Sequence, residues 1–163
     1  MQTKDAIRST MNVSTFVLNS YISDLDDDDL LRRPGKGCNH LAWQLGHLIN
    51  SEAQLVNSIC PGKGATLPAG FAEQHSKETT QSNDKSKFHS KQKYQELFEH
   101  VRGATLAALD AIPEAELDGP SPEHFRQHFP TVGDIFVLIA THPMMHAGQF
   151  VVVRRELGKP VLI

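Results

Sequence analysis

The sequence predicts an all-α protein, a four-helix bundle with one long crossover connection. Apolar side chains recur at steps of three and four residues in four stretches of the chain, which is the period of an amphipathic helix. These stretches are bounded by prolines, glycines or polar clusters, as helices usually are. No stretch alternates apolar and polar residues between hairpin turns, so we expect no strands.

Length and composition favour a single domain over residues 1–163. The chain has 163 residues, 39% of them hydrophobic, and a formal charge of −3. This is enough for one buried core, without the basic excess that binds nucleic-acid phosphates. The start lacks a signal-peptide pattern, and no apolar run approaches the roughly 18 residues of a membrane span. We expect a soluble cytoplasmic protein that binds neither nucleic acid nor membrane, with Cys38 and Cys60 reduced.

The first predicted helix covers residues 4–23, with Thr3 as candidate cap. The acidic run 24–29 would oppose the dipole of a helix ending there, so it predicts a turn and a new short helix around Leu30. The same run imitates the start of a calcium loop. It lacks the glycine and the terminal glutamate of that motif, so we predict no calcium site.

The second main helix is predicted over residues 39–59, with Asn39 as candidate cap. Residues 61–89 are polar with few large apolar side chains, and we expect a long surface connection. It has ample reach to cross the length of a bundle. The helices on either side of it can therefore run parallel, which gives an up-down-down-up bundle with the crossover in the middle.

The third helix is predicted over residues 91–111, because Pro113 cannot sit in a helix interior. A second polar stretch, rich in proline, follows it. Thr131 and Asp134 then have the spacing of a capping box. The fourth helix is accordingly predicted over residues 132–157.

Two histidines of the fourth helix, His142 and His146, stand four residues apart on its apolar stripe. At this spacing the side chains project from one face, so both can bind one ion at about 2.0–2.1 Å. His47 lies at the edge of the apolar face of the second helix, and antiparallel packing would bring it to the pair. Three imidazoles with open coordination positions are typical of catalytic metal sites. The alternative is three core histidines bonded to carbonyl groups.

Three further residues bear on this site. Glu52 occupies a leucine position one turn from His47, where a carboxylate needs a partner. It is a candidate to orient a ligand imidazole or to act as a base; the alternative is an ion pair at the bundle edge. His40 is a fourth ligand or, as we favour, a solvated ring near the helix start. Pro143 removes a helix hydrogen bond, and the resulting kink could aim His142 at the ion.

Other polar residues are expected to have no role in the site. His124 and His128 form a second pair at a four-residue spacing, but they lie in the proline-flanked stretch and should be exposed. Arg154, Arg155 and Lys159 suit the dipole at the end of the last helix. They need no function, although they could attract an acidic substrate.

Two stretches of the chain resemble the DinB-like (DinB/YfiT-like) metalloenzyme family. Residues 39–48, NHLAWQLGHL, with Glu52 following, resemble that family's second helix, and residues 142–149, HPMMHAGQ, resemble its fourth. The likeness spans nearly the whole chain. It implies an up-down-down-up bundle, often dimeric, with a metal on one histidine of the second helix and two of the fourth. Carried across, these ligands are His47, His142 and His146; the proline between the last two departs from the commoner pattern.

The predicted function is that of a metal-dependent enzyme. A divalent ion on the three histidines would lower the pKa of a bound thiol or water; zinc, nickel and iron all suit imidazole ligands. Glu52 and Gln149 are the predicted catalytic residues. The resemblance implies a homodimer and a small-molecule substrate such as a low-molecular-weight thiol, because characterised relatives include thiol transferases. The alternative is a non-catalytic helical module whose metal only stabilises the bundle. The 61–89 connection could cover the site mouth and set specificity.

Overall fold

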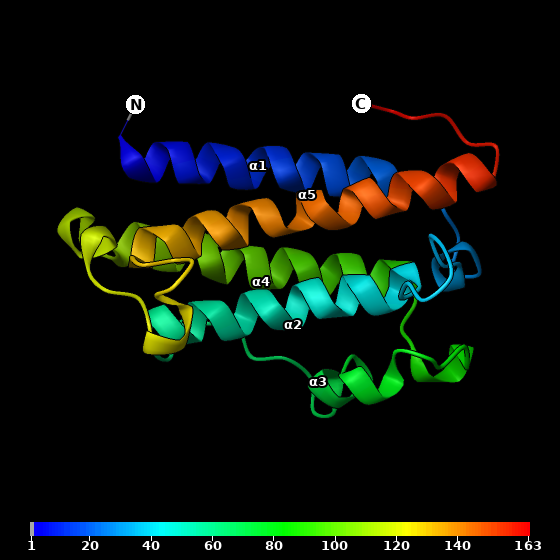
Figure 1. Ribbon diagram of the computed structural model, residues 1–163, viewed down its shortest axis with the longest axis horizontal. Helices are drawn as coiled ribbons and strands as arrows, with labels where there is room; N and C mark the ends of the chain where they lie inside the picture. The colour runs from blue at the N-terminus through cyan, green and yellow to red at the C-terminus, as the bar shows by residue number, and fades with distance from the viewer. Residues whose placement is uncertain (1) are drawn as a thin grey trace.

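The computed structural model describes residues 2–163, and in this range the chain forms helices and no β-strand. Four long helices make up the body of the protein: α1 (Thr3–Ile22), α2 (Leu41–Ile59), α4 (Lys91–Ala111) and α5 (Val132–Glu156). α1 lies along α5, and α2 lies along α4 and also contacts α5 (Figure 1). The predicted all-α fold is confirmed.

The bounds of the long helices agree with the predicted bounds to within two residues, but two predicted caps are wrong. Gln2, not Thr3, occupies the cap position of α1. His40, not Asn39, caps α2, because its Nδ1 accepts a hydrogen bond from the backbone N–H of Trp43 at 3.0 Å. An imidazole can satisfy a free N–H at a helix start as the usual oxygen caps do.

Both polar connections contain short helices that periodicity does not predict. The first holds α3 (Phe71–Gln74), η2 (Lys77–Thr79) and η3 (Lys85–Lys87), and the second holds η4 (Glu114–Asp118) and η5 (Glu123–Phe125). Residues 61–89 are more than a surface connection, since Phe71 and His75 are buried. The His75 ring lies against Gly46 of α2, where an added Cβ would be 2.0 Å from the ring carbon Cδ2. Glycine is therefore required at this contact.

His75 anchors the first connection through both ring nitrogens. Nδ1 donates to the carbonyl oxygen of Phe71 at 2.8 Å, and Nε2 accepts from the hydroxyl of Tyr94 at 2.8 Å. The carbonyl oxygen can only accept, so Nδ1 carries a proton. Because the pKa of His75 is far below 7, the ring is neutral and Nε2 is the nitrogen that accepts from the hydroxyl. Burial lowers the pKa of His75 to about 4, and it lowers the pKa of the buried His40 ring to about 4 as well.

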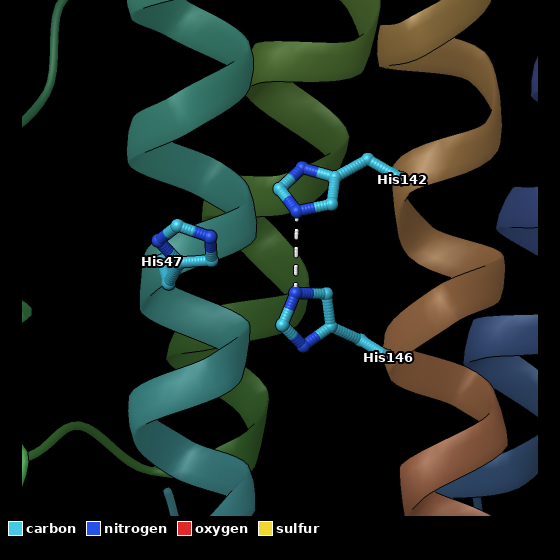
Figure 2. Close-up of side chains that lie close together, drawn as sticks. All are labelled: His47, His142 and His146. Carbon is cyan, nitrogen blue, oxygen red and sulfur yellow. Dashed lines mark hydrogen bonds between the residues drawn. The ribbon is translucent and has the colours of Figure 1, made fainter.

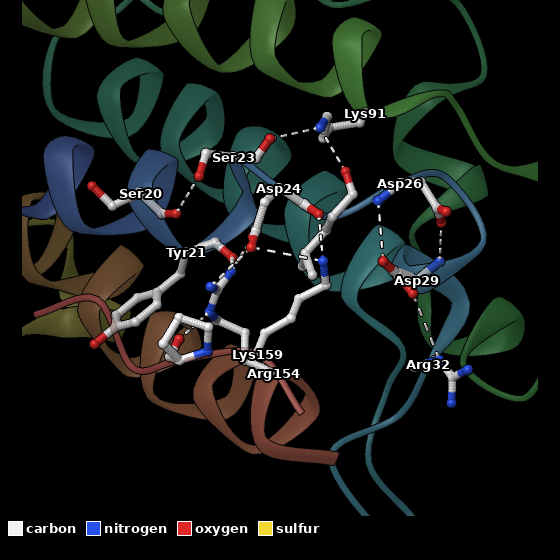
Figure 3. Close-up of polar contacts among 12 residues, drawn as sticks. Ser20, Tyr21, Ser23, Asp24, Asp26, Asp29, Arg32, Lys91, Arg154 and Lys159 are labelled. Carbon is white, nitrogen blue, oxygen red and sulfur yellow. Dashed lines mark hydrogen bonds and ion pairs between the residues drawn. The ribbon is translucent and has the colours of Figure 1, made fainter. Parts of the chain in front are cut away.

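Arg154 joins the end of α5 to the end of α1 (Figure 3). Its side chain is 0% exposed; the guanidinium donates to the carbonyl of Tyr21 at 2.9 Å and pairs with the carboxylate of Asp24. Lys159 donates to the carbonyl oxygen of Asp24 at 2.8 Å. The hydrogen bond from Arg154 lowers the pKa of the Asp24 carboxyl. Arg154 is thus a structural residue that cannot meet a substrate in solvent.

The rest of the acidic run forms the predicted turn. The backbone N–H of Asp29 donates to the carboxylate of Asp26 at 2.8 Å, and the N–H of Asp26 donates to Asp29 at 3.2 Å (Figure 3). Reciprocal capping of this kind satisfies free N–H groups at a helix start. The short helix η1 (Asp29–Leu31) follows, as predicted around Leu30, whose side chain is buried.

A polar layer divides the core of the bundle. One apolar cluster gathers near the C-terminal end of α1 and the other near its N-terminal end. Between them, each of the four long helices contributes polar side chains at the same level: Ser14, Glu52, Arg102, Thr105, His142 and His146. This layer places the candidate site in the middle of the bundle.

α5 is long and apolar enough to cross a membrane by length and composition, with a mean hydropathy of 1.4 in its most apolar window. In the bundle it packs against α1 and α2, and it carries the buried Arg154. These contacts are those of a core helix.

We expect Arg154→Met to lower the free energy of unfolding by about 2 kcal/mol, because it removes charged hydrogen bonds from a buried group. Urea denaturation at pH 7 measures the change. Arg155→Met, at the exposed neighbouring site, should stay within about 0.5 kcal/mol of the unaltered protein. Equal stability of the two variants would contradict a structural role for Arg154.

The stability of the fold should fall in mild acid. The pKa of His75 and His40 is about 4 in the folded chain, below the ordinary value of about 6.5. The unfolded chain therefore takes up protons first, so stability is full above about pH 6.5 and decreases toward pH 4. His75→Gln removes one of the titrating rings. The free energy of unfolding of this variant, measured between about pH 6.5 and about pH 4, should therefore depend less steeply on pH than that of the unaltered protein. His100→Gln, at an exposed position, is the control; identical slopes for all three proteins would contradict the assignment.

Candidate metal centre

His47, His142 and His146 meet between α2 and α5 (Figure 2). Each offers one ring nitrogen, and these three atoms all lie within 4.8 Å of one another. The ring of His47 is centred 5.2 Å from that of His142 and 5.4 Å from that of His146. The predicted meeting of the three rings is observed, so these side chains could hold a metal ion.

The pair on α5 has the spacing that one ion requires. Nε2 of His142 lies 3.2 Å from Nε2 of His146, and two nitrogens bound to a tetrahedral ion at about 2.0–2.1 Å would be roughly 3.3 Å apart. Burial lowers the pKa of His142 to about 4 and that of His146 to about 3. Both rings are therefore neutral at pH 7, which is the form that binds metals.

Gln44 of α2 sets the orientation of His146. Its Oε1 accepts a hydrogen bond from Nδ1 of His146 at 2.8 Å, while its amide nitrogen donates to the carbonyl of Asn39 at 2.7 Å. The amide oxygen can only accept, so Nδ1 of His146 carries the proton and Nε2 presents a lone pair. Such a partner fixes both the tautomer and the ring plane of a metal ligand. By its spacing, Gln44 lies on the same side of the helix as His40 and His47. Its partner His146 is 102 residues later in the chain, so the spacing alone does not reveal this contact.

Trp43 supports His47 from the side of the first connection. The two rings stack with centroids 5.2 Å apart and planes 10° from parallel. The indole nitrogen of Trp43 donates to the carbonyl of Ser76 and to the hydroxyl of Thr79, each at 3.1 Å. On the other side, the hydroxyl of Ser51 lies 3.4 Å from Nδ1 of His47. The 61–89 connection therefore fixes the indole ring of Trp43, and this indole in turn packs against the ring of His47.

Glu52 faces α4. Its carboxylate accepts from the hydroxyl of Thr105 at 2.6 Å and lies 3.0 Å from the guanidinium of Arg102. Burial raises the pKa of Glu52, and the charge of Arg102 opposes that rise. The ion pair was expected, as an alternative, at the bundle edge; it lies instead in the buried polar layer. A catalytic role for Glu52 stays a prediction.

His40 and Gln149 lie outside the three-ring cluster. The expectation of a solvated His40 ring is wrong, because the ring is buried and packs edge-on against Phe88, with centroids 4.4 Å apart. Gln149 is half-buried on α5, and its role in orienting a substrate stays a prediction. α5 continues as one helix through Pro143.

A groove of about 380 Å³ opens beside the three rings, between α2, α5 and η5. His142 belongs both to the ring cluster and to the groove wall. His124, exposed as predicted, lines the groove with Phe125. None of the described lining residues comes from 61–89, so the connection expected to set specificity does not form this groove.

We expect Gln44→Leu to weaken zinc binding by about 10- to 100-fold, because loss of an outer partner releases the tautomer and orientation of His146. Competition against a chromophoric chelator measures the affinity. Gln54→Leu changes an exposed glutamine of the same helix and should leave the affinity unaltered. Equal affinities for the two variants would show that Gln44 does not position the ligand.

Comparison with known proteins places the chain in a family. A solved structure described as the conserved protein of locus from Enterococcus faecalis superposes with a TM-score of 0.73, covering 98% of this chain and 99% of that one at 16% identity. At this identity the likeness shows the fold alone. No curated protein matches the chain. Residues 16–150 match the model of the DinB superfamily. This match covers most of the sequence, and the chain belongs to the DinB superfamily.

Proposed function

We propose that the chain is a cytoplasmic up-down-down-up bundle whose His47, His142 and His146 hold one divalent metal ion, and that this centre activates a thiol or water nucleophile. The observation that carries the proposal is the convergence of three ring nitrogens within 4.8 Å. When bound, the ion would supply the positive charge that lowers the pKa of a thiol or water at neutral pH.

The residues of the chain would position the metal ligands and give a reactant access to them. Three neutral imidazoles would leave the charge of a divalent cation uncompensated, and a set of three ligands leaves room for a reactant. Gln44 keeps the Nε2 lone pair of His146 directed into the cluster. Because His142 also lines the groove, a reactant bound there lies beside the ligand set.

We favour a small-molecule reaction with a low-molecular-weight thiol. The thiol would lose its proton to solvent, the thiolate sulfur would form a bond to an electrophilic carbon, and the leaving group would depart with the electron pair of the broken bond. Hydrolysis would follow the same course with water as the nucleophile. The thiol rests on the family resemblance, whereas a small-molecule reactant is also supported by the size of the groove, about 380 Å³.

Protein purified without a polyhistidine tag should contain close to one equivalent of zinc, nickel or iron per chain by elemental analysis. His47→Ala should lose the metal, because two imidazoles hold an ion far less tightly than three. His100→Ala, which changes an exposed histidine of α4, should retain it. Metal content that is unaffected by His47→Ala would exclude the three-ring site.

Turnover is tested with the metal-loaded protein, cysteine or glutathione, and chlorodinitrobenzene as electrophile. The metal-dependent rate should fall by about 100-fold or more in His47→Ala and stay unaltered in His100→Ala. Bound metal without turnover against any thiol or ester would favour the alternative function, a non-catalytic module whose metal only stabilises the helices.

A further inference from the structure

The groove borders the three-histidine cluster at His142, the one histidine of the cluster in its described lining. His142 forms part of its wall, and so does Ser51, whose hydroxyl lies 3.4 Å from Nδ1 of His47. A molecule bound in the groove would therefore have one end next to the ring cluster. The other end would lie between α2 and η5.

The described lining of this groove contains no Asp, Glu, Lys or Arg. Two other hollows of the molecule differ in this respect: Asp118 and Asp134 line one, and Lys63 and Glu116 line the other. The polar side chains of the groove, Ser51, Gln54, Ser58, His124 and His142, can hydrogen-bond a neutral group. A charged group that enters would lose part of its hydration without gaining a carboxylate, ammonium or guanidinium partner. The lining of the groove thus favours an uncharged occupant.

Size and side-chain chemistry narrow the class of occupant. Leu55, Phe125, Leu138 and Met145 give apolar contact on three sides. Met145 is 59% exposed at the rim, and a flexible thioether adapts to aromatic rings and contacts them favourably. A cavity of about 150 Å³ is enough for benzene, so a groove of about 380 Å³ has room for a substituted ring.

We propose that this groove binds the uncharged, ring-bearing part of the substrate, with a hydroxyl or thiol head group directed toward His142. A catalytic role for the groove rests on the proposed function, since the head group of the bound molecule would react at the metal centre. Binding of the ring-bearing part in the groove does not need the metal. The two ideas can therefore fail separately.

The test uses para-fluorobenzyl alcohol as a neutral probe, followed by fluorine NMR with the full-length protein. We expect a saturable change of the fluorine signal with a Kd of about 1 mM, as is usual for a ligand of this size, both in excess chelator and after zinc loading. In chelator, para-fluorobenzoate and para-fluorobenzylammonium should bind at least tenfold more weakly. Chelator is needed for this comparison because a carboxylate could bind zinc directly.

Leu138→Trp should weaken binding of the alcohol at least tenfold by filling the groove. Val137→Trp adds the same ring at the exposed neighbouring position and should bind like the unaltered protein. Ser58→Tyr fills the groove from the α2 wall and should also abolish binding, which separates occlusion from misfolding. Zinc content is measured on every variant.

The proposal is overturned if the alcohol gives no saturable change, if both filled variants bind it normally, or if the charged probes bind equally well in chelator. If the unaltered protein contains zinc but does not bind the probe, the groove proposal is wrong and the proposed metal centre is unaffected. If the protein binds the probe but takes up no zinc, the groove proposal is supported and the proposed function is wrong.

Discussion

The rest of the structure depends on the presence of imidazole rings in the middle of a helical bundle. A buried ring needs partners for its polar nitrogens, and these partners must come from other helices. His146 is satisfied by Gln44 of α2 and by His142 of its own helix. The apolar core stops on both sides of this level. α2 and α5 are thereby held in one axial relation, because sliding either helix by a turn would separate the rings from their partners.

The same layer contains the buried pair of Glu52 and Arg102, which stability alone does not explain. Replacing a buried ion pair by apolar residues is often neutral or stabilising, because desolvation offsets the attraction. The ion pair of Glu52 and Arg102 joins α2 to α4 at the level of the histidine rings. The hydrogen bond between Gln44 and His146 joins α2 to α5 at the same level. We interpret the layer as a device that fixes the register of three helices around the site, at a cost to the stability of the core.

The parts of the structure that follow from local periodicity could be predicted from the sequence. Helix bounds follow from the spacing of apolar side chains, and His142 with His146 follows from the four-residue repeat. The role of His40 could not be predicted, because Phe88 covers its ring from a connection with no regular period. His75 is the clearest case: it is buried only because Gly46 leaves space for the ring on α2. Such contacts depend on where a connection folds back, which periodicity does not encode.

The two polar connections, residues 61–89 and residues 112–131, contact different parts of the candidate site. Residues 61–89 hold the indole of Trp43, which stacks on His47, so they limit the movement of a ligand ring. Residues 112–131 supply Phe125 to the groove, so they shape the space that a reactant enters. Changes in the first connection should therefore act on the rings, and changes in the second should act on the choice of reactant. If the groove binds a reactant as proposed, changes in residues 112–131 would alter the choice of reactant without disturbing the three imidazoles, because the two tasks would rest on separate segments of the chain.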